Sequence, residues 1–155
     1  MPDDTRDSSL DIVSARTFEA PREAVFDAFC DAEQLAHWWG PAGFRHTLHE
    51  RDLRPGGAWR FTMHGPDGTD YPMVQEFLDV QPTERIVYRN IHPTHGFTMT
   101  MTLVQVGERT QLTWRMRFES DDEARAVRQA VLQGNEQNFD RLAAHLAAWP
   151  ADARR

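Results

Sequence analysis

The sequence has one cysteine, fewer basic than acidic residues and no long apolar run, and each of these features argues against a class of protein. A lone Cys30 among apolar neighbours permits no internal disulfide and is typical of a thiol that acts as a small hydrophobe. All 17 positive residues are scattered arginines, and the net charge of −7 argues against nucleic acid as a main partner. Because we find neither an apolar leader nor a run of about 18 apolar residues, we expect a cytoplasmic protein without membrane insertion.

Length and composition predict a single domain. At 155 residues, with 40% hydrophobic and 26% charged residues, the chain matches an ordinary globular domain. Residues 1–9 are polar and residues 150–155 begin with a proline, so we expect two disordered tails. Residues 10–149 contain no linker, repeat or low-complexity block, and we therefore expect one folded unit.

The first third of the chain predicts one strand and two short helices. Residues 10–19 alternate between two faces, as a strand does. Apolar residues then recur at helical spacing up to Gly40 and Pro41. The second helix begins with a predicted capping box, in which Asp31 accepts from the backbone and Gln34 reaches back to it.

The rest of the chain predicts six strands and one long helix. Between Phe44 and Phe118 the hydrophobic period is two, and turns rich in proline and glycine separate the segments. Ser120, followed by three acidic residues, begins a helix that should run to about Trp149. Gly134 interrupts this helix at a cost of about 1 kcal/mol relative to alanine, which is easier to understand if backbone or a ligand comes close there.

These elements predict an α+β fold. A one-sided antiparallel sheet must have its apolar face covered, and only the last helix is long enough to do so. The middle of that helix, residues 133–138, is more polar than a plain cover, which leaves the size of any cavity beneath it open.

The order of elements and five stretches of sequence resemble the START-like (SRPBCC) superfamily, in its bacterial branch related to the activator of the heat-shock protein 90 ATPase. The resemblance runs from residue 10 to residue 149. It rests on residues 16–29, 36–44, 52–60, 65–68 and 82–88, which include the motifs HWWGPAGF and DLRPGGAWR.

This resemblance implies a helix-grip fold. A seven-stranded, curved antiparallel sheet would wrap around the long C-terminal helix, with two short helices after the first strand and a cavity in between. Members of the superfamily are described as ligand carriers, cyclases, dehydratases and co-chaperones, so the resemblance implies a fold and leaves the activity open.

Methionine and tryptophan dominate the predicted inner faces. Flexible methionines adapt to varied apolar ligands, whereas the alternative is that these side chains only fill a core. The predicted ligand-binding residues are Trp38, Trp39, Phe44, His46, Trp59, Phe61, Met63, Tyr88, Met99, Met101, Trp114, Met116 and Phe139.

Few residues are candidates for catalysis. His46 and Tyr88 are in phase with inward residues, whereas strand 71–80 supports two phases and leaves it open whether Gln75 or Glu76 faces inward. His46, Glu76 and Tyr88 are therefore weak candidates for a general acid or base, without a matched pair. The histidines do not have the spacing of metal ligands, and the sequence contains no motif of a catalytic nucleophile or a phosphate-binding loop. We therefore expect neither metal nor cofactor.

Three functions follow as hypotheses. The first is binding of a small hydrophobic ligand, lipid-like or aromatic, in an internal cavity. The second is a cyclase or dehydratase acting on a polyketide-like substrate. The third is a co-chaperone-like interaction module, for which a chaperone partner is an analogy with relatives. A homodimer through a sheet edge or through the pair Trp38 and Trp39 also stays open.

Overall fold

The structure is a computed structural model that describes residues 10–149. The predicted tails, residues 1–9 and 150–155, lie outside the described residues. The elements are β1 (Ile12–Phe18), α1 (Arg22–Cys30), α2 (Ala32–Trp38), β2 (Arg45–Arg51), β3 (Ala58–His64), β4 (Asp70–Gln81), β5 (Arg85–Asn90), β6 (Phe97–Val106), β7 (Arg109–Phe118) and α3 (Asp121–Ala148).

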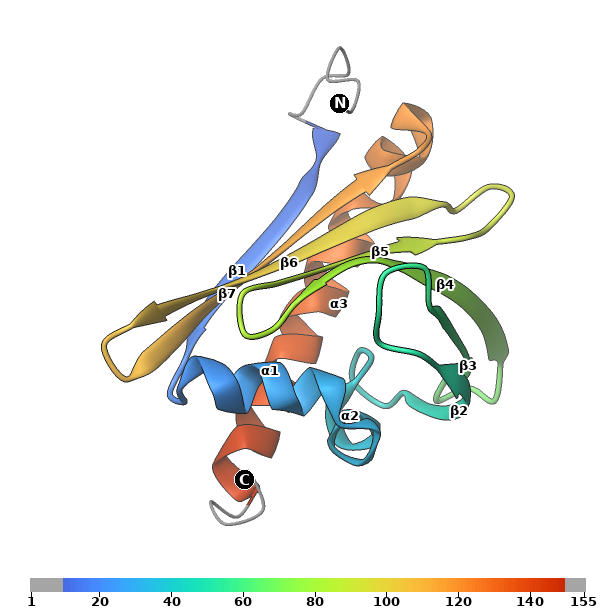
Figure 1. Ribbon diagram of the computed structural model, residues 1–155. Coiled ribbons are helices and arrows are strands. Elements are labelled where there is room, and N and C mark those ends of the chain that lie inside the picture. The colour runs from blue at the N-terminus through green and yellow to red at the C-terminus, as the bar shows by residue number, and fades with distance from the viewer. Residues whose placement is uncertain (1–9, 150–155) are drawn as a thin grey trace.

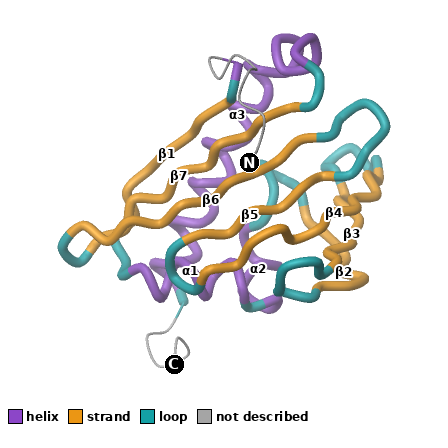
Figure 2. Tube along the Cα trace, turned by 45° about the horizontal axis from the view of Figure 1, so that its top comes forward, coloured by secondary structure: helices purple, strands orange, loops and turns teal. Residues whose placement is uncertain are grey.

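All seven strands form one curved antiparallel sheet in the order β1-β7-β6-β5-β4-β3-β2. The first strand thus lies beside the last. Figures 1 and 2 show α3 along one face of this sheet, with α1 and α2 near its C-terminal end. The predicted α+β helix-grip architecture is confirmed.

Helix α3 begins as its sequence predicts. The Ser120 hydroxyl oxygen accepts a hydrogen bond from the backbone N–H of Glu123 at 3.1 Å, and three acidic residues stand in the positively polarised first turn. The close approach of backbone that could explain Gly134 is wrong. A Cβ built there would meet only the Pro41 Cγ at 3.7 Å, an ordinary contact, so packing does not require the glycine.

Helix α2 begins with half of the predicted capping box. The Asp31 carboxylate accepts from the Glu33 N–H at 3.1 Å. Gln34 does not reach back to the backbone: its amide donates to the Asp31 carboxylate at 3.3 Å, and its Oε1 lies 2.8 Å from the His145 Nε2. Because His145 offers a buried partner on α3, the Gln34 side chain links α2 to α3.

The ambiguous strand β4 is settled by a bulge. Gln75 and Phe77 are buried on the inner face, whereas Val74 and Leu78 are exposed. The pairing of β4 with β5 shifts between Phe77 and Asp79. One extra residue at this bulge exchanges the two faces, which brings Val80 against the core, whereas Val74 and Leu78 are exposed apolar residues.

Candidate functional site

A cavity of about 150 Å³ lies between the inner face of the sheet and the middle of α3. Five strands, β3 to β7, contribute to its wall, together with α3 and the loop after α2. Its lining residues are Trp39, Gly40, Pro41, Phe61, Met63, Met73, Gln75, Tyr88, Phe97, Met99, Trp114, Met116, Asn135 and Asn138.

Buried Asn138 fixes the loop 39–41 against the cavity. Its Nδ2 donates to the Trp38 carbonyl oxygen at 2.7 Å, and its Oδ1 accepts from the Gly40 N–H at 3.2 Å. Arg141, one turn further along α3, donates to the carbonyl oxygens of Gly40 and Pro41 at 2.9 and 3.0 Å. Two side chains of α3 therefore hold this part of the wall through backbone groups.

Gly40 is favoured by its backbone conformation, and a side chain there would displace a flexible neighbour. Its φ of +107° is one that side-chain-bearing residues rarely adopt. A Cβ built there would lie 2.5 Å from the Met63 Cε, which itself lines the cavity. Any larger residue would strain the loop and displace a wall residue.

Asn135 connects the cavity wall to the first strand. Its Nδ2 donates to the Ser14 hydroxyl at 3.2 Å and lies 3.7 Å from the Met116 sulfur. Ser14 is buried on β1, opposite Trp114 in the ladder with β7. This contact explains why the inner face of β1 carries a polar residue.

A polar chain runs from the cavity to the surface. The Gln75 Nε2 donates to the Asn90 Oδ1 at 3.2 Å, and the Asn90 Nδ2 donates to the His95 carbonyl oxygen at 3.1 Å. His95 belongs to the loop between β5 and β6, and its ring Nδ1 lies 2.6 Å from the Glu123 Oε2 on α3. The chain thus ties the wall of the cavity to the start of α3.

A wider groove adjoins the cavity. It measures about 340 Å³ and lies between the ends of β4 and β5 and the first half of α3. Met73 and Phe97 line both hollows, so these two side chains form their common wall. The groove and the cavity therefore adjoin each other at these two side chains.

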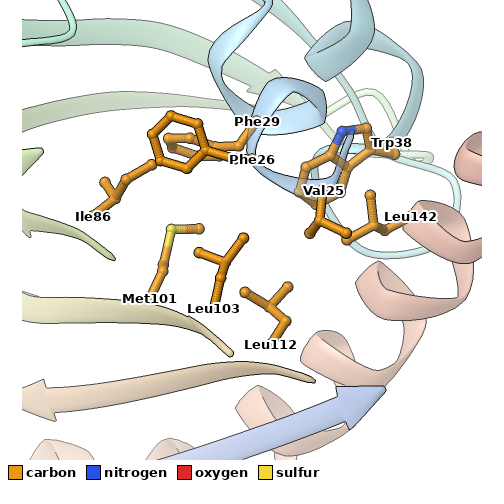
Figure 3. A pocket seen from close by; sticks show the side chains of 9 residues that line it. All are labelled: Val25, Phe26, Phe29, Trp38, Ile86, Met101, Leu103, Leu112 and Leu142. Carbon is orange, nitrogen blue, oxygen red and sulfur yellow. The ribbon is translucent and has the colours of Figure 1, made fainter. Parts of the chain in front are cut away.

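A third hollow, shown in Figure 3, is a packing gap. It measures about 10 Å³, roughly the space of one water molecule. Its walls are apolar and provide no hydrogen-bonding group for a ligand. It is lined by Val25, Phe26, Phe29, Trp38, Ile86, Met101, Leu103, Leu112 and Leu142.

The predicted ligand-binding residues divide into three groups. Those that line the cavity are Trp39, Phe61, Met63, Tyr88, Met99, Trp114 and Met116. Trp38 and Met101 line only the packing gap. Phe44, His46, Trp59 and Phe139 line neither hollow.

The residues outside the cavity have identifiable packing roles. Trp59 stacks on Phe77 with ring centroids 5.6 Å apart, and Phe139 packs against Trp114 at 4.7 Å. The Trp38 indole N–H donates to the Ala28 carbonyl oxygen at 2.9 Å. These contacts belong to the core, and a role of these residues in ligand binding stays a prediction.

Sequence reasoning missed the polar wall of the cavity. Asn135 and Asn138 stand in the polar stretch of residues 133–138, which was visible in the sequence, but their direction was not. Gln75 was left open because of the two-phase strand. Met73 and Phe97 were not assigned to the site, although both recur at the inward spacing.

The three weak catalytic candidates are not brought together. Glu76 as an inward acid or base is wrong: it lies on the other face of β4 from Gln75, 3.6 Å from the Arg89 guanidinium. His46 lies on the edge strand β2 beside Phe61, and burial lowers its pKa. Only Tyr88 lines the cavity, where burial raises its pKa and keeps its hydroxyl protonated.

Two further predictions concern the surface and metal binding. Trp38 and Trp39 are 1% and 7% exposed, so the idea of an exposed tryptophan pair as a dimer interface is wrong. Within residues 10–149, no three side chains of the His, Cys, Asp and Glu types gather as a metal site would require. In the same range, no helix combines the length and apolarity needed to cross a membrane.

A curved antiparallel sheet, a long helix across its inner face and a cavity between them define a helix-grip domain of the START-like class. The model of the family described as "Activator of Hsp90 ATPase homolog 1-like protein" matches residues 19–147. The chain therefore belongs to this family. A partnership with a chaperone stays a prediction by analogy.

Solved structures are similar over nearly the whole chain. A protein from Arthrobacter aurescens superposes with a TM-score of 0.83 at 22% identity, covering 94% of this chain and 91% of that one. A protein from Mycobacterium smegmatis gives 0.80 at 25% identity over 95% and 98%, and one from Chromobacterium violaceum gives 0.79 at 27% over 89% and 97%. No curated protein matches.

Proposed function

We propose that the protein binds a small, uncharged, mostly apolar molecule in the cavity between the sheet and α3. The observation that carries this proposal is the cavity itself, about 150 Å³ in size and walled by aromatic rings, methionines and a few amide groups. Concave, mainly apolar hollows with a small number of polar groups are the usual form of small-molecule sites.

The volume favours an aromatic ring over a lipid. An apolar cavity of about 150 Å³ accepts a benzene-sized molecule. A long acyl chain would need the adjoining groove of about 340 Å³ as well, and Met73 and Phe97 stand between the two hollows. Of the two ligand types predicted from sequence, the aromatic one fits the cavity as it stands.

Two variants on one strand test the proposal. Met99 on β6 lines the cavity, whereas Val104 on the same strand is 48% exposed. Met99→Trp should fill the cavity, and Val104→Trp adds the same ring at the surface. The probe is toluene, and the measurement is the melting temperature with and without it.

A ligand at ten times its dissociation constant adds about 1.4 kcal/mol to the stability of the folded state. For a chain of this length we expect a rise of roughly 3–6 °C in the wild type and in Val104→Trp. We expect no rise in Met99→Trp. Equal responses of all three proteins, or none in the wild type, would refute binding in this cavity.

A further inference from the structure

The cavity wall contains a hydrogen-bond acceptor without a partner. Gln75 lines the cavity and is 2% exposed, and its Oε1 is buried and accepts no hydrogen bond from the described residues. An unpaired buried amide oxygen is unfavourable, and such groups are rare unless something outside the chain satisfies them.

The neighbouring strand determines which amide atom of Gln75 has no hydrogen-bond partner. Asn90 lies opposite Gln75 in the ladder between β4 and β5, and its Nδ2 donates to the His95 carbonyl oxygen at 3.1 Å. Since a carbonyl oxygen can only accept, Asn90 must turn its Oδ1 toward Gln75. Gln75 must then present its Nε2 to that oxygen, as it does at 3.2 Å. Reversing the Gln75 amide would place two acceptors together, so Oε1 stays available.

A second polar atom in the wall is also unpaired. Trp114 lines the cavity and is 1% exposed, and its indole Nε1 is buried without an acceptor among the described residues. An indole N–H can only donate. The two side chains therefore leave one acceptor and one donor unused.

The lining of the cavity provides no counter-charge for a charged ligand. Among the described residues that line the cavity, none carries a formal charge. A buried ion without a counter-charge is strongly unfavourable, so this lining disfavours a carboxylate or an ammonium group. The lining therefore favours a ligand that is neutral as well as small.

We propose that the ligand is a neutral single-ring molecule bearing a hydroxyl or amino group that donates a hydrogen bond to the Gln75 Oε1. A hydroxyl would match the wall most fully, because its oxygen can also accept from an indole N–H such as that of Trp114. This inference rests on the proposed function and adds the chemical group by which the cavity selects its ligand.

Phenol and toluene test the inference because they have the same ring and the same number of non-hydrogen atoms. Their dissociation constants are measured by calorimetry for the wild type and for Gln75→Met, which keeps the length of the side chain and removes the acceptor. We expect the preference for phenol over toluene to fall about tenfold in Gln75→Met, as for loss of one hydrogen bond in a buried site.

Gln81→Met is the matched control. Gln81 lies on the same strand, is exposed, and donates to the Asp79 carboxylate rather than to the wall of the cavity. Its replacement should leave the preference for phenol unchanged.

The outcomes separate the two proposals. If both probes bind and their ratio is the same in wild type and Gln75→Met, the role of Gln75 is refuted while cavity binding stands. If neither probe binds the wild type, the proposed function fails, and this inference fails with it.

Gln75→Met leaves the Asn90 Oδ1 unpaired, so a second measurement uses only the wild type. In a crystal structure of the phenol complex, the hydroxyl oxygen should lie within hydrogen-bond distance of the Gln75 Oε1. A bound ring with its oxygen turned elsewhere overturns the inference, whether or not the variant folds.

Discussion

Replacing Asn138 by alanine should destabilise the protein far more than replacing its neighbour Gln137. Both residues stand on α3 and bond to the same loop. Asn138 is 5% exposed and joins the Trp38 carbonyl oxygen and the Gly40 N–H. The half-buried Gln137 accepts one bond, exposed to solvent, from the Ala42 N–H at 3.1 Å.

The magnitudes follow from burial. Asn138→Ala leaves one buried carbonyl and one buried N–H unpaired, and each such group costs about 1–3 kcal/mol. We expect a total loss of about 2–6 kcal/mol, which corresponds to roughly 4–24 °C in melting temperature for a chain of this length. In Gln137→Ala, water replaces the lost partner, so we expect a loss below about 1 kcal/mol.

Urea unfolding followed by tryptophan fluorescence measures both values by linear extrapolation. The Asn138→Ala variant should also bind toluene more weakly, because the loop it releases contributes Trp39, Gly40 and Pro41 to the cavity. Losses that agree within about 0.5 kcal/mol for the two variants would refute the reasoning, since burial would then make no difference.

Two further predictions concern single residues. Gly134→Ala should stabilise the protein by up to about 1 kcal/mol in the same urea assay, because its Cβ would make only an ordinary contact with Pro41; a loss of stability would contradict this. For His46, burial first, and then Arg51, Arg141 and His64, lower the pKa below 6.5. Just below pH 6.5 the unfolded chain therefore binds more protons than the folded one, so stability falls with decreasing pH in this window, and His46→Leu should flatten that fall. A parallel pH profile in the variant would show that His46 does not contribute.

The sequence was sufficient for the architecture because its signals are local and repeated. The alternation of apolar and polar residues along β6 and β7 predicts their faces without reference to the rest of the chain. The Ser120 cap and the acidic turn after it predict where α3 begins. Such features depend on neighbours a few residues apart, which is the range that a sequence displays.

The cavity was predictable only in part because it depends on which side chains leave space. Trp59 and Met99 both face inward, yet Trp59 stacks on Phe77 while Met99 borders the hollow. Periodicity predicts that both side chains face inward, but it does not predict which of them packs in the core and which lines the cavity. The inward direction of Gln75 could not be predicted because an inserted residue at the bulge after Phe77 changes the phase of the strand.

The pairing of β1 with β7 has a consequence for how the molecule is made. Asp11, just before β1, bonds to Arg115 of β7, 104 residues later in the chain. Contacts this distant in sequence slow folding, because a long loop must close before they can form. A polypeptide emerging from the ribosome therefore holds its first strand without a ladder partner until nearly all of the sheet has been synthesised.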